Sequence, residues 1–72
     1  MFTKAVAHEG HTRRFTIGAA GSLGWELRVE EDGVVVETVA YTDWHRVERA
    51  LRTIADRISR LEDVGWRETL TV

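Results

Sequence analysis

Four arginines in one segment are the residues of this sequence best suited to bind an anion. Residues 43–65 have helical periodicity, and at about 100° per residue the arginines fall opposite the apolar positions, with Thr53 in their middle. They are Arg46, Arg49, Arg57 and Arg60. A row of guanidinium groups on one helix can hold phosphates along a nucleic-acid backbone. The row therefore makes nucleic-acid binding one candidate function.

Acidic residues in the same segment favour a different interpretation of that face. Glu48 lies four residues before Arg52, and Asp56 lies four residues before Arg60. This is the favourable order for ion pairs on a helix. Such pairs would dilute the positive charge, so the arginine face is also consistent with a solvated or protein-contacting surface.

Three histidines raise the question of a metal site. His8 and His11 flank an expected turn at Glu9 and Gly10, while His45 begins the helical segment. A metalloprotease motif needs two histidines four apart on a helix, and a closed metal site needs four ligands. Because nothing brings His45 near the other two, we expect turn and edge histidines with no metal or other cofactor.

The sequence contains no recognisable catalytic set. There is no Cys, and neither Ser22 nor Ser59 has an identifiable base partner. The glycine-rich residues 18–24 lead into an expected strand, so they lack the helix start that presents backbone amides to a phosphate. We therefore expect that this protein is not an enzyme.

Length and composition predict one small domain, residues 1–72. A chain of 72 residues has room for a modest core, near the size at which stability is marginal. The net charge of −2 argues against a domain built mainly to hold nucleic acid, although a local basic face is still allowed. No apolar run approaches a membrane span or the core of a signal peptide, so we expect a cytoplasmic protein with no membrane partner.

Residues 43–65 predict one long amphipathic helix. The apolar residues repeat every three or four positions; they are Trp44, Val47, Leu51, Ile54, Ile58 and Leu61. Asp43 is a suitable N-cap. Gly65 can adopt the left-handed conformation that closes a helix, and Trp66 can then fold back onto Leu61 in a Schellman ending.

Four strands are predicted before the helix, over residues 2–8, 11–19, 24–31 and 34–41. The third and fourth form a hairpin, because Asp32-Gly33 is a preferred two-residue turn. That turn predicts a register in which Val29 pairs with Val36, Leu27 with Thr38 and Trp25 with Ala40. The same register sets Arg28 opposite Glu37 as an ion pair on the outer face.

The strand at residues 34–41 is apolar on both faces. The predicted register turns Val36, Thr38 and Ala40 inward with Val34, and turns the other face outward with Val35, Val39 and Tyr41. A single helix cannot cover both faces of a sheet. Either a second subunit covers the outward set, or the tail at residues 68–72 folds over it, or it is exposed.

These elements predict an α+β domain: a four-stranded antiparallel meander sheet with one long C-terminal helix packed across one face (ββββα). The predicted core is Trp25, Leu27, Val29, Trp44, Leu51, Ile54 and Ile58. An open sheet face can also bind single-stranded nucleic acid through aromatic and basic side chains. Here Arg14, Arg28 and Tyr41 are expected on that face among several glutamates, which makes a poor platform.

Residues 24–68 resemble small bacterial proteins of uncharacterised function with this strand and helix plan. The segment is also distantly similar to the WGR domain, which has a Trp-bearing strand, further strands and a helix ending in Gly plus an aromatic residue, here Gly65-Trp66. WGR domains occur in nucleic-acid-associated proteins. The Trp-Gly-Arg signature of that family is absent, so the resemblance concerns topology and assigns no site residue.

The sequence as a whole favours a non-catalytic interaction module that forms a homodimer or binds another protein. The predicted contact surface is the outward patch Val35, Val39 and Tyr41, since contiguous exposed apolar surface commonly marks an interface. The alternative is a nucleic-acid-binding domain that uses Arg46, Arg49, Arg57 and Arg60.

Overall fold

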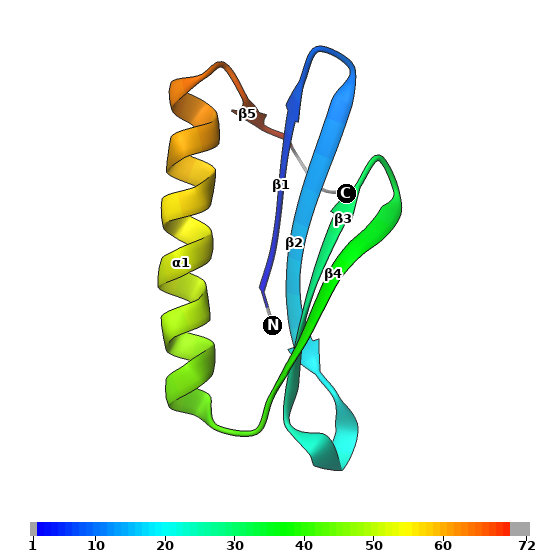
Figure 1. The fold of residues 1–72 in the computed structure, drawn as a ribbon, viewed down its shortest axis with the longest axis vertical. Helices are drawn as coiled ribbons and strands as arrows, with labels where there is room; N and C mark the ends of the chain where they lie inside the picture. Colours follow the sequence, from blue (N-terminus) through cyan, green and yellow to red (C-terminus); the bar gives the residue numbers. More distant parts are fainter. Residues whose placement is uncertain (1, 70–72) are drawn as a thin grey trace.

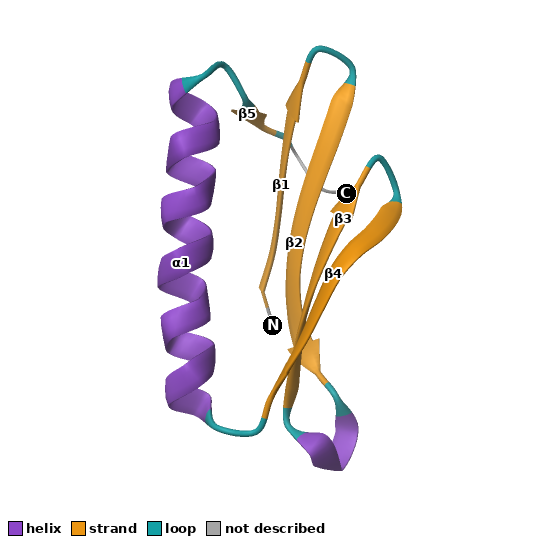
Figure 2. Cartoon of the chain, viewed as in Figure 1, coloured by secondary structure: helices purple, strands orange, loops and turns teal. Residues whose placement is uncertain are grey.

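A five-stranded antiparallel sheet carries one long helix across one of its faces (Figure 1). The computed structural model describes residues 2–69. The strands are β1 (Phe2–His8), β2 (His11–Ala19), β3 (Trp25–Glu31), β4 (Val34–Tyr41) and β5 (Arg67–Glu68), and the helix is α1 (Trp44–Asp63). A 3-10 turn, η1 (Gly21–Leu23), joins β2 to β3 (Figure 2). The predicted α+β plan of four strands and a helix is confirmed, with the two-residue β5 as an addition.

The strand order is β4-β3-β2-β1-β5, which places β4 at one edge of the sheet. The segment after α1 runs to the other edge, where Glu68 pairs with Val6 and the Thr69 amide donates to the Ala5 carbonyl at 2.9 Å. The tail as far as Thr69 therefore lies away from β4 and does not cover it. Residues 70–72, which the sequence analysis considered as part of that cover, lie outside the described residues.

Both hairpin turns have the expected conformation. Asp32 and Gly33 have φ of 53° and 82°, and Glu9 and Gly10 have φ of 51° and 81°. Positive φ at both central residues is the signature of a type I′ turn, whose twist matches that of the flanking strands. The turns at both hairpins are therefore fixed by local sequence.

The predicted register of the β3–β4 hairpin is wrong beyond its first two pairs. Glu31 pairs with Val34 and Glu30 with Val35, as the turn requires, but a bulge then sets Val29 opposite Glu37. The extra residue is Val36, and every later residue of β4 changes face. Leu27 consequently pairs with Val39, and Trp25 with Tyr41.

This bulge has a physical reason in the size of the side chains that it buries. Without it, the helix side of β4 would receive Val36, Thr38 and Ala40, and the bulge replaces them by Glu37, Val39 and Tyr41. With it, the larger Val39 and Tyr41 pack against the core, and burial of apolar area is the main favourable term in folding. The strand is therefore a better cover for α1 with the bulge than without it.

Helix α1 begins and ends where the sequence predicts. The Asp43 carboxylate accepts from the His45 amide at 2.9 Å, which confirms the N-cap. At the other end the Gly65 amide donates to the Glu62 carbonyl at 3.2 Å, and the Trp66 amide donates to the Leu61 carbonyl at 3.0 Å. With Gly65 at φ 108°, this is the predicted Schellman motif.

The core lies between α1 and the middle of the sheet. Its buried members are Val6, Phe15, Ile17, Leu27, Val29, Val47, Ala50, Ile54 and Ile58. Each fully buried large side chain stabilises the fold by about 1.5–3 kcal/mol. Trp25 and Leu51 pack at the margin of this core. Trp44, predicted as a core residue, is 49% exposed and only rests its ring edge against Trp25 at 5.2 Å between centroids.

Candidate binding surfaces

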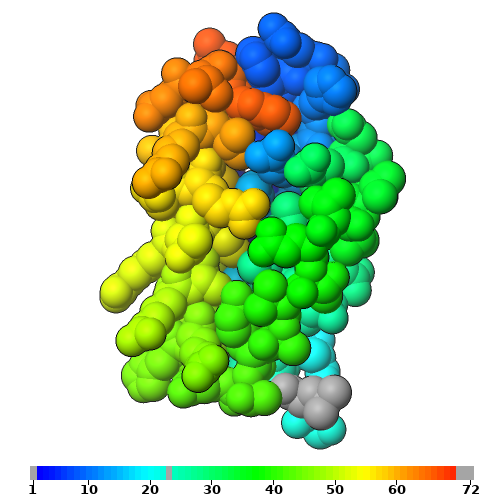
Figure 3. Space-filling model, viewed as in Figure 1, coloured from blue at the N-terminus to red at the C-terminus, as the bar shows by residue number. Residues whose placement is uncertain are grey.

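A groove lies between α1 and β4. It encloses about 460 Å³ and has an apolar floor that includes Leu27, Ala50 and Ile54. The helix contributes Arg46, Arg49, Thr53 and Arg57 to its wall, and β4 contributes Glu37 and Tyr41. Figure 3 shows this side of the molecule, with the hollow between the yellow and green helix and the green strand. A volume of this size falls within the range of ligand sites.

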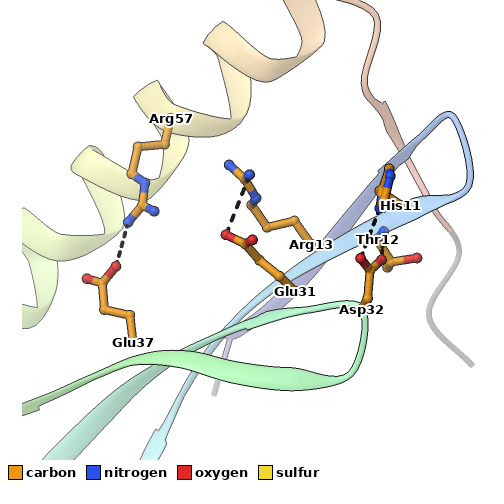
Figure 4. A network of polar contacts seen from close by, with 7 residues as sticks. All are labelled: His11, Thr12, Arg13, Glu31, Asp32, Glu37 and Arg57. Atoms are coloured by element: carbon orange, nitrogen blue, oxygen red, sulfur yellow. Dashed lines mark hydrogen bonds and ion pairs between the residues drawn. The ribbon is translucent and has the colours of Figure 1, made fainter.

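Arg57 bridges the groove from the helix to the sheet. Its guanidinium lies 3.6 Å from the Glu37 carboxylate on β4 (Figure 4). The same guanidinium lies 5.1 Å above the Phe15 ring. Both charged side chains are about two-fifths exposed. The cation–π contact and the ion pair together hold Arg57 in one orientation.

Glu37 was expected to pair with Arg28 across the hairpin, and that prediction is wrong. Arg28 instead donates to the Glu26 carboxylate at 2.9 Å on its own strand. The bulge is the reason, because it moves Glu37 from the outer face to the helix side. A carboxylate expected on the solvent face therefore contributes to the groove.

Arg46 and Arg49 are exposed and make no ion pair within the described residues. They lie one helical turn apart on the flank of α1 that faces β4. The core centre of α1 is at Val47, Ile54 and Ile58, and the arginines lie roughly 80–160° away from it on the helical wheel. All were expected opposite the apolar face, but Arg57 and Arg46, at about 80° and 100°, lie beside it, and only Arg49, at about 160°, lies nearly opposite.

Arg60, the fourth predicted arginine, does not line the groove. Its guanidinium pairs with Asp56 at 3.1 Å, which confirms that ion pair. The other predicted pair is not formed, because Glu48 lies 3.7 Å from His45 rather than beside Arg52. Three of the four arginines therefore line the groove, and the acidic residue that lines it with them is Glu37.

The predicted contact patch of Val35, Val39 and Tyr41 does not exist as one surface, and this face assignment is wrong. Val39 and Tyr41 pack against the core from the helix side, while Val35 is 48% exposed. The bulge at Val36 separates them onto different faces. The exposed apolar residues of β4 are instead the consecutive Val34, Val35 and Val36.

The free edge of β4 is the second candidate surface. In residues 2–69 its only strand neighbour is β3, so the backbone groups on its other side have no strand partner. Such an edge is a template for another strand, and the three exposed valines lie at one end of it. The groove and the free edge lie next to each other along the same strand.

The outer face of the sheet offers no aromatic platform. Arg14 and Arg28 lie there as expected, next to Glu26 and Glu30. Tyr41, expected on this face, is on the helix side. Stacking of bases on the outer face therefore loses its aromatic residue.

His8 and His11 are register partners across the β1–β2 turn, but each of the three histidines contacts a different residue. His8 packs against Trp66 with 5.7 Å between ring centroids, and His45 lies near Glu48. His11 lies 2.9 Å from Asp32, whose hydrogen bond and charge raise the pKa of His11; the same hydrogen bond lowers the pKa of Asp32 (Figure 4). Among the described residues, no group of three or more His, Cys, Asp or Glu side chains is arranged to hold a metal ion.

One cluster was missed by sequence reasoning. The Arg13 guanidinium lies 5.2 Å from the Trp66 ring centre and 3.5 Å from Glu31. Trp66, which follows the end of α1, therefore contacts both His8 and Arg13. No short-range pattern indicates this cluster, because β1, β2 and the residues after α1 meet only in the folded chain.

No family model, curated protein or solved structure matches this chain. These comparisons neither support nor contradict the resemblance to the WGR domain. Within the described residues, no helix has the length and apolar character needed to cross a membrane.

Proposed function

We propose that this chain is a non-catalytic interaction module that forms a homodimer by antiparallel pairing of β4 with β4 of a second copy. The observation that carries the proposal is the free edge of β4 together with the exposed Val34, Val35 and Val36. An antiparallel pair of identical strands is self-complementary, as a two-fold interface requires. Pairing would satisfy backbone groups that have no strand partner within the described residues.

The charges of β4 are compatible with this self-association. Glu37 is the only charged residue between positions 34 and 41, and it pairs with Arg57 of its own chain. Two β4 strands can therefore approach without strong repulsion. Residues 37–41 lie beyond the bulge and form the regular part of the edge, and the three valines add apolar contact at its other end.

Light scattering on Val35→Lys and Val64→Lys tests the dimer. Both positions are exposed valines, but Val64 lies at the C-terminal end of α1, away from the β4 edge. We expect a dimeric wild type, a monomeric Val35→Lys and a dimeric Val64→Lys. Val39 is unsuitable for this test, because it packs against the core.

Two results would contradict the proposal. A wild type that stays monomeric at millimolar concentration removes the homodimer. A Val35→Lys variant that dimerises as well as Val64→Lys removes β4 as the interface. The cytoplasmic location expected from the sequence stays a prediction.

Nucleic-acid binding is the second candidate, and one observation favours it. Arg46, Arg49 and Arg57 line a single groove, and Arg46 and Arg49 make no ion pair within the described residues. This function predicts oligonucleotide binding that weakens steeply with salt and is lost in Arg46→Ala/Arg49→Ala. Arg52→Ala is the matched control, since Arg52 is exposed on another face of α1. No anisotropy change with single- or double-stranded oligonucleotides at low salt would remove this candidate.

A further inference from the structure

We infer that the β4 edge and the adjoining arginine groove form a binding site for an extended acidic peptide, which docks as an additional strand beside β4. Its carboxylates would contact Arg46 and Arg49. This inference is independent of the homodimer, although the peptide and a second copy would compete for the same edge. The argument rests on three features: the free edge, an ion pair already present in the fold and the spacing of the two arginines.

The free edge provides the backbone part of the site. An extended peptide placed beside β4 would pair with the N–H and C=O groups on the side that faces away from β3. This mode of recognition gives affinity through the main chain and specificity through alternate side chains. The regular residues 37–41 lie directly beside the groove, since Glu37 and Tyr41 line it.

The Arg57–Glu37 pair shows how a strand carboxylate meets this flank of the helix. Glu37 extends from the helix side of β4 and lies 3.6 Å from Arg57. Arg46 lies eleven residues before Arg57 in the sequence. On a helix the two side chains therefore point in nearly the same direction, and Arg46 lies about 16 Å nearer the N-terminal end of α1. A strand rises about 3.3 Å per residue, so about 16 Å along the helix corresponds to about five strand residues. Because Arg57 lies at the level of Glu37, Arg46 lies at the level of the Tyr41 end of β4. At that level β4 itself provides no carboxylate.

The spacing of the two arginines matches alternate residues of a strand. Residues three apart on a helix have Cβ atoms about 5–6 Å apart. Residues i and i+2 of a strand lie on one face about 6.6 Å apart. An acidic residue at every second position would therefore present one carboxylate to Arg46 and the next to Arg49. The residues between them would extend the outer face next to Thr38 and Ala40.

A peptide fits these observations better than a nucleic acid does. Glu37 lies within the groove, Arg60 lies outside it, and the chain as a whole has a net charge of −2. A polyphosphate chain cannot use the free backbone groups of β4 as a strand does. A peptide uses both the edge and the arginines.

Fluorescence anisotropy with a short labelled peptide of alternating glutamate and threonine tests the inference. We expect binding that weakens as salt is added, at least tenfold loss in Arg46→Ala/Arg49→Ala, and little change in Arg52→Ala. Replacing the glutamates of the peptide by glutamine, or its central threonines by proline, should each abolish binding. The proline peptide tests strand pairing, because proline cannot donate to a ladder.

Several outcomes would overturn the inference and leave the homodimer untouched. These are no binding of the peptide, equal binding of the proline peptide, or tighter binding of a single-stranded oligonucleotide at the same salt. Light scattering on the same samples distinguishes the two proposals. Peptide binding by a monomeric wild type supports this inference and removes the homodimer. If the wild type is a dimer, saturating peptide should dissociate it, because the peptide and the second copy compete for the β4 edge. A dimer that still carries bound peptide would show that the peptide and the second copy do not share this edge.

Discussion

Gly65 is the position at which one added methyl group should disturb both the end of α1 and its contact with the sheet. Its φ is 108°, and a Cβ atom there would lie 2.8 Å from Cε1 of His8 and 3.2 Å from Nδ1. Carbon atoms of side chains do not approach that closely. The Gly65→Ala substitution therefore demands a strained backbone and a displaced His8 ring.

The two costs can be calculated separately. A left-handed conformation costs an L-residue about 1–2 kcal/mol. Displacing His8 also disturbs its packing on Trp66, where the ring centroids are 5.7 Å apart, and contacts between aromatic rings contribute about 0.5–1.5 kcal/mol. The expected loss in the free energy of unfolding is about 1.5–3.5 kcal/mol, and each kcal/mol lowers Tm by roughly 4–8 °C in a domain of this size.

Urea unfolding followed by tryptophan fluorescence measures this loss, with Gly33→Ala as the matched control. Gly33 has φ of 82°, but nothing lies within 4 Å of an added Cβ. Its substitution should cost only the backbone part, so Gly65→Ala should be the more damaging of the two. In a His8→Ala background the cost of Gly65→Ala should fall to that of Gly33→Ala.

Two results would refute this reasoning. If Gly65→Ala costs no more than Gly33→Ala, the contact between Gly65 and His8 is not present in the protein. If the His8→Ala background leaves the cost of Gly65→Ala unchanged, the strain has another source.

Two further predictions concern the register of β4 and the ion pair at its turn. Val39→Ala should destabilise the protein by about 1–1.5 kcal/mol, since it removes two methyl groups that are partly buried against the core. Val35→Ala should cost clearly less, because both variants lose the same strand preference but Val35 is exposed. Equal losses in urea unfolding of the two variants would contradict the bulged register. By NMR titration, Asp32→Asn should lower the raised pKa of His11 toward 6.5; an unchanged value would show that Asp32 is not the cause. The stabilisation that comes from charged His11 is fully present below the pKa of His11 in the unfolded chain, and it is lost as the pH rises through the raised pKa of the folded protein. The stabilisation that comes from ionised Asp32 is present above the pKa of Asp32 in the unfolded chain, and it is lost as the pH falls through the lowered pKa of the folded protein.

Much of the fold could be predicted because its signals are local. The helix follows from a repeat of three and four, and Asp43 and Gly65 mark its ends through interactions within one turn. The Asp32-Gly33 turn likewise acts only on its neighbours, and the first two strand pairs after it are as predicted. Beyond them the bulge at Val36 depends on which side chains α1 can bury, and a hairpin alone carries no such information.

The candidate site was predicted only in part for the same reason. The arginines could be grouped from the helical period, but the wheel alone does not say which flank lies beside which strand. Arg57 meets Glu37 because of the way α1 lies over β4, whereas the Arg60–Asp56 pair lies within α1 and was predicted from its spacing. The edge position of β4 depends on the order of the strands, which is a property of the whole sheet.

The sequence by itself determined the elements of this protein, since propensity, capping and turn chemistry act between residues a few positions apart. Only the tertiary structure decided which face of β4 is buried, that its edge is free and that three arginines share one groove. Those outcomes come from competition among residues far apart in the chain for a limited buried volume, and that competition is resolved only when the helix and the sheet pack together.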